Sequence, residues 1–154
     1  MTYEDLLTRA DCDGLVVKEK PIRGNDGRIK GHRIAIRNTI ETQDKKSCVL
    51  AEELGHYYTT VGNILDQSSV ENRKQELRAR LWAYNKMIGL FGIISAYERG
   101  CRSALEMAEY LNVTVEFLHD AISQYRSKYG VCVEVDNYVI FFMPSLAVME
   151  RISD

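Results

Sequence analysis

The sequence predicts an α+β fold with a helical core, a small N-terminal sheet, a helix-turn-helix-like helix pair and a C-terminal β-hairpin. Short alternating apolar runs lie beside turn signals near both ends of the chain. Between them, apolar residues recur at helical spacing behind residues that commonly cap helices. The content of 45% hydrophobic and 27% charged residues suits an ordered globular protein.

The N-terminal part predicts one helix and a small sheet. Residues 2–10 place apolar side chains at helical spacing, with Thr2 as the N-cap. Residues 15–17 predict a short strand. The run G-N-D-G at residues 24–27 predicts a turn. Residues 29–36 alternate well enough to form one strand that leads towards the core helices.

Two long helices are expected next. The first spans about residues 45–60, and Thr42 or Asp44 is suited to cap it. Gly62 marks the loop that follows it. The second helix, at about residues 71–87, is rich in good helix formers.

The C-terminal part predicts a helix pair. Residues 103–111 and 114–129 form two helices joined by a short turn, with Thr114 capping the second, in a pattern similar to a helix-turn-helix. Glu116 and Asp120 lie near the start of the second helix, where they would repel phosphate. We therefore interpret the pair as structural and expect no nucleic-acid partner.

The chain is expected to end in a hairpin. Residues 131–135 and 138–143 flank the two-residue turn of Asp136 and Asn137. The remaining residues, to 154, are expected to form a short frayed tail. We assign residues 1–100 to a core and residues 101–154 to the helix pair plus hairpin, packed on the core as one unit.

Bulk properties exclude some classes of protein. The net charge of −2 gives no general attraction to nucleic acid. No apolar run reaches the roughly 18–20 residues of a membrane span. The first residues lack the pattern of a signal peptide, and the four cysteines are too scattered for a disulfide framework. We expect a cytoplasmic protein with no membrane partner.

The segment E-E-L-G-H, residues 52–56, differs by one residue from the zinc-peptidase signature H-E-x-x-H. Glu52 and His56 lie one helical turn apart on one face, where two ligands can hold one metal. Glu53 is placed to act as a general base. On spacing alone, the two glutamates also suit a solvated helix face, and His56 suits a histidine near the core.

A third ligand must come from another element. Glu76 is the best candidate, because an antiparallel second helix would return it to the level of His56. Ala79 and Ala83 keep the same helix face small, which permits close packing. Tyrosine hydroxyls could stabilise an oxyanion, although aromatic residues at helical spacing are more often core; the three candidates are Tyr57, Tyr58 and Tyr84.

Residues 34–83 resemble the ImmA/IrrE family of metallopeptidases, which are found with phage and mobile-element repressors. The resemblance is carried by the strand I-A-I at residues 34–36, the helix L-A-E-E-L-G-H at residues 50–56, and E-L-R-A-R-L-W-A at residues 76–83. The last run matches the family's E-x-x-A-x-x-(aromatic)-A pattern. Family members commonly continue with a helix-turn-helix-like segment, and residues 105–125 are similar to one.

The resemblance implies a zincin-like core and a site in which Glu53 is the general base towards zinc-bound water. It implies that His56 and Glu76 are zinc ligands and that Glu52 occupies the place of the family's first histidine. A second carboxylate would weaken zinc as a Lewis acid and favour harder ions such as manganese. The implied function is a peptidase acting on a protein substrate such as a phage or mobile-element repressor. The alternative is a non-catalytic relative, without a metal, that acts as a protein-interaction module.

Overall fold

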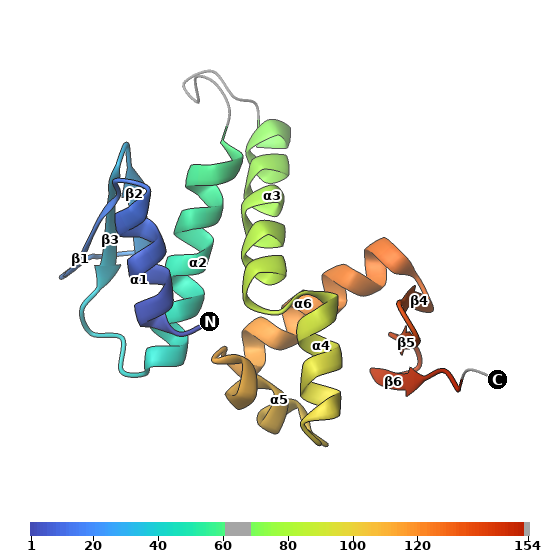
Figure 1. The fold of residues 1–154 in the computed structure, drawn as a ribbon. Coiled ribbons are helices and arrows are strands. Elements are labelled where there is room, and N and C mark those ends of the chain that lie inside the picture. Colours follow the sequence, from blue (N-terminus) through green and yellow to red (C-terminus); the bar gives the residue numbers. More distant parts are fainter. Residues whose placement is uncertain (61–68, 153–154) are drawn as a thin grey trace. The chain divides into compact units, whose positions relative to one another are not determined.

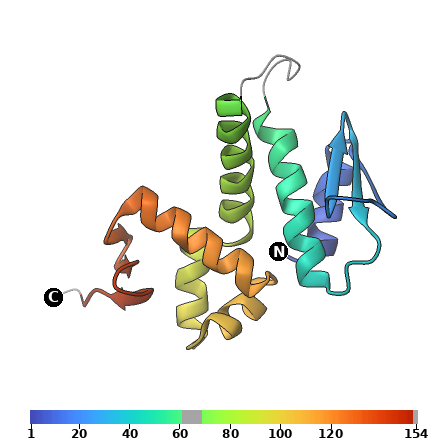
Figure 2. The ribbon, with the colours of Figure 1, turned by 180° about the vertical axis from the view of Figure 1, so that it is seen from behind.

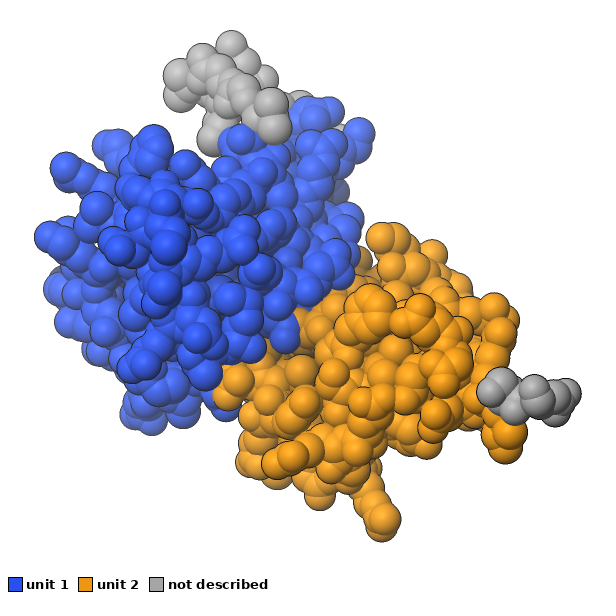
Figure 3. Space-filling model, viewed as in Figure 1, with its two compact units in different colours: residues 1–87 blue, residues 88–154 orange. Residues whose placement is uncertain are grey.

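The computed structural model describes residues 1–60 and 69–152 of the chain. Its mixture of helices with an N-terminal and a C-terminal sheet confirms the α+β class. The chain divides into two compact units, Met1–Met87 and Ile88–Asp154, which are coloured separately in Figure 3. The helix of residues 89–98 therefore groups with the second unit, and the packing of the two predicted parts as one body stays a prediction.

In the first unit, helices α1 and α2 pack on one face of a three-stranded sheet (Figures 1 and 2). The sheet has the order β1-β3-β2, with β1 parallel and β2 antiparallel to β3. Helices α2 and α3 lie side by side and antiparallel. The elements are α1 (Tyr3–Cys12), β1 (Val16–Lys20), β2 (Gly27–Lys30), β3 (Arg33–Arg37), α2 (Gln43–Thr59) and α3 (Ser69–Met87).

The prediction of one strand at residues 29–36 is wrong, because this segment contributes to two antiparallel strands, β2 and β3. Gly31 adopts φ +60°, a conformation that ends β2 and starts the turn into β3. The turn predicted at residues 24–27 ends one residue earlier than expected. Gly24 has φ +89°, but Gly27 already belongs to β2. The alternation of apolar and polar residues continues through the turn at Gly31, so the sequence alone predicts one strand instead of two.

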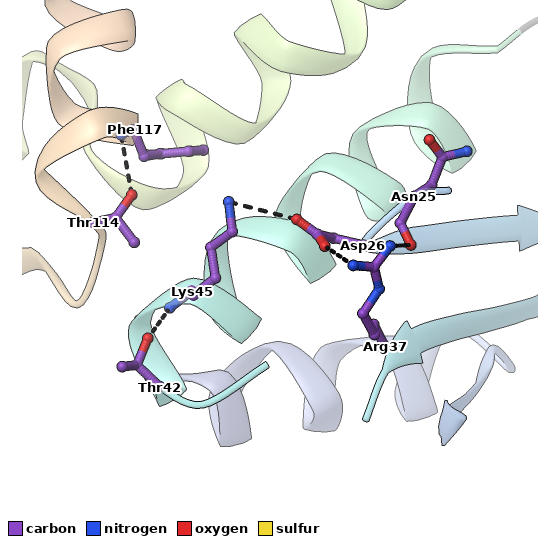
Figure 4. Close-up of polar contacts among 7 residues, drawn as sticks. All are labelled: Asn25, Asp26, Arg37, Thr42, Lys45, Thr114 and Phe117. Atoms are coloured by element: carbon purple, nitrogen blue, oxygen red, sulfur yellow. Dashed lines mark hydrogen bonds and ion pairs between the residues drawn. The ribbon is translucent and has the colours of Figure 1, made fainter. Parts of the chain in front are cut away.

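Side-chain caps begin the helices of the first unit. Thr2 and Asp5 form a reciprocal capping box at α1. Thr42 Oγ1 accepts a hydrogen bond from the Lys45 backbone nitrogen at 3.2 Å (Figure 4). Thr42 is therefore the cap of α2, and Asp44 lies inside its first turn. The loop predicted around Gly62 lies outside the described residues.

An acidic residue of the first unit joins the sheet to the start of α2. Asp26 lies 3.3 Å from Arg37 Nη1 on β3 and 3.7 Å from Lys45 Nζ on α2 (Figure 4). Arg37 also donates to the backbone oxygen of Asn25 at 2.7 Å. These contacts tie the loop before β2 to the helix that carries the candidate site. They hold the start of β2, the edge strand, against α2.

The second unit packs three helices with a three-stranded antiparallel sheet of order β4-β5-β6. Thr114 Oγ1 accepts from the Phe117 nitrogen at 3.1 Å, which confirms the predicted cap of α6 (Figure 4). Asp136 has φ +52° in the predicted hairpin turn. The elements are α4 (Gly89–Glu98), α5 (Ala104–Leu111), α6 (Val115–Tyr129), β4 (Cys132–Val135), β5 (Tyr138–Phe141) and β6 (Ala147–Glu150).

The frayed tail expected after residue 143 is wrong, because β6 pairs with β5. Three of its four residues are apolar and consecutive, so apolar and polar residues do not alternate along it and give no signal for a strand. Ile140 and Phe142, on and just after β5, are fully buried in this unit. In the described residues, no helix has both the length and the apolar character needed to cross a membrane.

Candidate functional site

The candidate site lies where α2 and α3 meet. His56 Nε2 on α2 is 3.1 Å from Glu76 Oε2 on α3. The other oxygen of Glu76 lies 3.3 Å from Arg80 Nε, one turn further along α3. The prediction that an antiparallel helix returns Glu76 to the level of His56 is therefore confirmed. Arg80 and His56 together hold the Glu76 carboxylate from two sides.

The two helices approach closely because small residues line their contact. A Cβ atom on Gly55 would lie 2.2 Å from the backbone oxygen of Ala79, a distance that no side chain tolerates. Ala79 and Ala83 are fully buried on the facing side of α3. The prediction of a small helix face is confirmed. Gly55 supplies the matching gap on α2, so this approach allows the side chains of His56 and Glu76 to meet.

Glu53 lies between α2 and the edge strand of the sheet. An added Cβ on Gly27 of β2 would be 2.9 Å from Glu53 Oε1 and 2.7 Å from Val49 Cγ1. The glutamate carboxyl thus lies against β2 at Gly27. Burial, with smaller contributions from the negative charges of Glu52 and Glu76, raises the pKa of Glu53 from 4.5 to about 7.

Such a carboxyl exchanges its proton near neutral pH, which is the property that a general base or acid needs. Two of its neighbours are carboxylates, so the site carries an excess of negative charge. A bound cation would relieve that repulsion, because an opposite charge favours the ionised form of each carboxyl. The electrostatics of the site thus suit both proton transfer and cation binding.

The donor atoms fit a divalent cation in their chemistry. Imidazole nitrogen and carboxylate oxygen are donors that zinc takes in catalytic sites. His56 and Glu76 already converge, and Glu52 lies one helical turn before His56 on α2. Within residues 1–60 and 69–152, however, no three His, Cys, Asp or Glu side chains are grouped closely enough to hold a metal ion. Two of the three predicted ligands are thus in place, and the roles of Glu52, Glu53, His56 and Glu76 stay predictions.

A cavity of about 540 Å³ opens beside the His56–Glu76 pair. It is bounded by α2, α3 and the turn between β2 and β3, all within the first unit. Ile29 of β2 contributes to its wall. Ile29 of the edge strand and the His56–Glu76 pair therefore border one space of a size that admits several atoms of a ligand.

His32 and Tyr57 also line this cavity, and their position was not predicted from the sequence. Their rings meet edge to face, with centroids 5.6 Å apart. His32 is exposed in the turn between β2 and β3, which the prediction of one strand at residues 29–36 did not contain. The signal that locates it is the K-G-H-R run at residues 30–33, with glycine at the turn.

The other two tyrosines considered as hydrogen-bond donors have structural surroundings. Tyr58 stacks on Trp82, with ring centroids 5.0 Å apart, and the Arg9 guanidinium lies over its ring. Tyr84 is 4% exposed and belongs to the core. Of the three candidates, Tyr57 is the one that lines the cavity. It is therefore the tyrosine best placed to contact a ligand there.

Comparison with known protein families places the chain among peptidases. A family of peptidases, described as the IrrE N-terminal-like domain, matches residues 10–123. This range is well over half of the chain and contains every residue of the candidate site. Searches among curated proteins and among solved structures gave no match.

Proposed function

The chain belongs to the IrrE N-terminal-like family of peptidases, and on that premise we propose that it is a metal-dependent peptidase. In this proposal Glu52, His56 and Glu76 bind the metal, and Glu53 is the general base. The observation that carries it is the 3.1 Å approach of His56 Nε2 to Glu76 Oε2 across two helices. The pair lies beside a cavity, and the negative charge of Glu76 contributes to the raised pKa of Glu53, the proposed base.

Each side chain of this site has its own role in the proposed hydrolysis. A bound divalent cation would supply Lewis acidity to the peptide carbonyl and lower the pKa of a water molecule. Glu53 takes a proton from the attacking water and passes it to the nitrogen of the departing peptide. Arg80 holds Glu76 in position through the oxygen that does not face His56. Tyr57 and His32, which also line the cavity, would contact the substrate.

The edge strand β2 supports a peptide as the substrate. In the described part of the chain β2 pairs with β3 alone, so its second edge has unused backbone donors and acceptors. An extended peptide can add to such an edge through main-chain hydrogen bonds. Ile29 of β2 lines the cavity, so a peptide bound there would run past Glu53 and the His56–Glu76 pair. A transcriptional repressor of a phage or mobile element is the protein substrate that we propose.

The donor set also bears on the choice of metal. Two carboxylates and one imidazole place more negative charge on the ion than two imidazoles and one carboxylate would. This set tolerates harder ions, so manganese is the proposed alternative to zinc. The same extra charge makes zinc a weaker Lewis acid and predicts a slower reaction than a site with two histidines would give.

A second candidate function is favoured by one observation. The described residues do not gather three ligands, and the first histidine of the signature is Glu52. A relative that has lost the metal would keep the cavity and the open strand edge, and would bind a peptide without cleaving it. This protein-interaction module is the alternative to the enzyme.

Metal binding separates the two candidates. The chelator-treated full-length protein is titrated calorimetrically with zinc and, separately, with manganese. We expect one equivalent of at least one ion to bind, and we expect Glu76→Gln to abolish that binding. The matched control is Glu41→Gln, which removes an exposed carboxylate on the loop before α2. A wild-type protein that binds neither ion, or a Glu76→Gln variant that binds as well as wild type, would overturn the enzyme proposal.

A further inference from the structure

The face of the N-terminal sheet that points away from α1 and α2 is strongly basic. Side chains alternate along each strand, and Ile34 and Ile36 of β3 are buried on the helix side. The register then places the neighbouring side chains of all three strands on the opposite, exposed side. We call this surface the basic face; its cationic residues are Lys18, Lys20, Arg28, Lys30 and Arg33, and all five are exposed.

No acidic side chain of the three strands balances this charge. Glu19 of β1 lies in sequence between two residues of the basic face, but it points to the helix side, where Lys46 Nζ lies 2.6 Å from its carboxylate. Asp26 is engaged by Arg37 and Lys45. Among the residues that the structure describes, no ion pair includes a member of the basic face.

The arrangement is unfavourable for the protein alone. Lys30 is directly opposite Arg33 across the β2–β3 ladder. Like charges at directly opposed positions destabilise a sheet. The basic face also surrounds a hollow of about 420 Å³ whose remaining wall is apolar, from residues such as Val16 and Ala35. A cluster of mutually repelling cations around a hollow indicates an anionic partner.

The chemistry of the face favours acidic side chains over nucleic acid. Its strands present no aromatic ring on which an unpaired base could stack. They also present no Asn or Gln that could contact base edges. The face instead continues to the open edge of β2, since Arg28 and Lys30 belong to that strand. An extended peptide added to this edge would place every second side chain beside them.

We propose that the basic face selects peptides with acidic residues at alternate positions. Paired with β2, such a peptide would direct its Asp or Glu side chains towards Arg28 and Lys30. Its intervening side chains would face the cavity that contains His56 and Glu76. Successive side chains on one face of a strand are about 6.5–7 Å apart, so carboxylates at positions i and i+2 match the spacing of Arg28 and Lys30. The inference rests on the proposed function in that the bound peptide is the one presented to that site.

Binding of a short fluorescein-labelled peptide of alternating Glu and Thr tests this inference. The full-length protein is titrated without added metal, and fluorescence anisotropy reports binding. The double variant Arg28→Glu/Lys30→Glu should bind at least about tenfold more weakly than wild type, because attraction becomes like-charge repulsion. The matched control is Arg23→Glu/Arg99→Glu, which makes the same change in net charge at exposed positions outside the face and should bind within about twofold of wild type.

A second readout separates a docking role from a structural one. Lys30→Glu replaces a repulsive cross-strand pair with an attractive one, so this variant should melt at a higher temperature than wild type while binding the peptide more weakly. A lower melting temperature together with unchanged peptide binding would mean that the lysine has a structural role, and it would overturn the proposal.

Other outcomes are equally decisive. Equal binding by wild type and the double variant, or no binding by wild type, would overturn the inference. Tighter binding of a labelled DNA duplex than of the peptide, lost in the same double variant, would assign the face to nucleic acid instead. Because binding is measured without metal or cleavage, a protein that cleaves nothing can still pass this test. An active peptidase can likewise fail it.

Discussion

The two faces of the N-terminal sheet carry opposite chemistry. The inner face is mostly apolar, but Gly27 lies against the carboxyl of Glu53, and Glu19 forms an ion pair with Lys46 there. The outer, basic face has five exposed cations with no ion-pair partner among the described residues. Strand β2 contributes to both faces, because neighbouring side chains point in opposite directions. A single edge strand therefore separates an acidic candidate site from a basic surface, and neighbouring substitutions on it should have unlike effects.

Removing the charge of Glu53 should produce the largest effect on stability. The pKa of Glu53 is about 7 in the folded protein and 4.5 for an ordinary glutamate. Between these values the folded state binds the proton more tightly than the unfolded chain does, so stability falls as pH rises through this window. The full difference corresponds to about 3 kcal/mol. Glu53→Gln should therefore increase the free energy of unfolding by up to about 3 kcal/mol at pH 8 and by little near pH 4.

Urea unfolding of the metal-free protein at the two pH values measures this difference. Glu41→Gln is the control, and it should change neither value by more than about 0.5 kcal/mol. A gain for Glu53→Gln that is the same at both pH values would show that ionisation of Glu53 is not its cause.

Substitutions at two neighbouring residues of β2, one on each face, compare how much each face contributes to stability. Gly27→Ala places a methyl group within 3.0 Å of Val49 and Glu53, which should reduce the free energy of unfolding by about 1–3 kcal/mol through overpacking. Arg28→Ala, on the basic face, should change it by no more than about 0.5 kcal/mol. Chemical denaturation of both variants provides the measurement. Equal losses would mean that the two faces are not distinct in the way described.

Strand β1 gives a smaller version of the same comparison. Glu19 forms an ion pair with Lys46, whose side chain is only 14% exposed. Glu19→Gln should reduce the free energy of unfolding by about 1 kcal/mol, at the upper end for ion pairs near a surface. Its neighbour Lys18 points outwards, and Lys18→Gln should be neutral or slightly stabilising. If thermal unfolding showed the larger loss for Lys18→Gln, the assignment of the two faces would be reversed.

Much of the fold followed from local sequence signals. The caps Thr2 and Thr114 were predicted, and Thr42 was one of two candidates for α2, because a threonine hydroxyl just before a helical run can accept from a free backbone N–H. The misses have local causes as well. Gly31 interrupts a run whose apolar alternation continues across the turn, and β6 has too few buried residues to show a pattern.

The candidate site was predictable only in part. Helix periodicity put Glu52 and His56 on one face, and an antiparallel partner brought Glu76 to His56. Burial of Glu53 under Gly27 depends on the sheet edge crossing α2, a tertiary contact that spacing along one helix cannot indicate. The basic face was missed for a similar reason. Its cations come from three strands, and only the sheet register gathers them.

The most direct test of the proposed peptidase activity is zinc-dependent cleavage of a peptide library derived from a proteome. New peptide termini are counted by mass spectrometry for the wild-type protein and for Glu53→Gln, each with zinc and with a chelator. We expect the wild-type protein to cleave peptides with zinc, and we expect the rate to fall by about 10²–10⁴-fold in the variant, the usual contribution of a general base. Wild-type protein that cleaves nothing with zinc, or a Glu53→Gln variant that cleaves equally well, would contradict it.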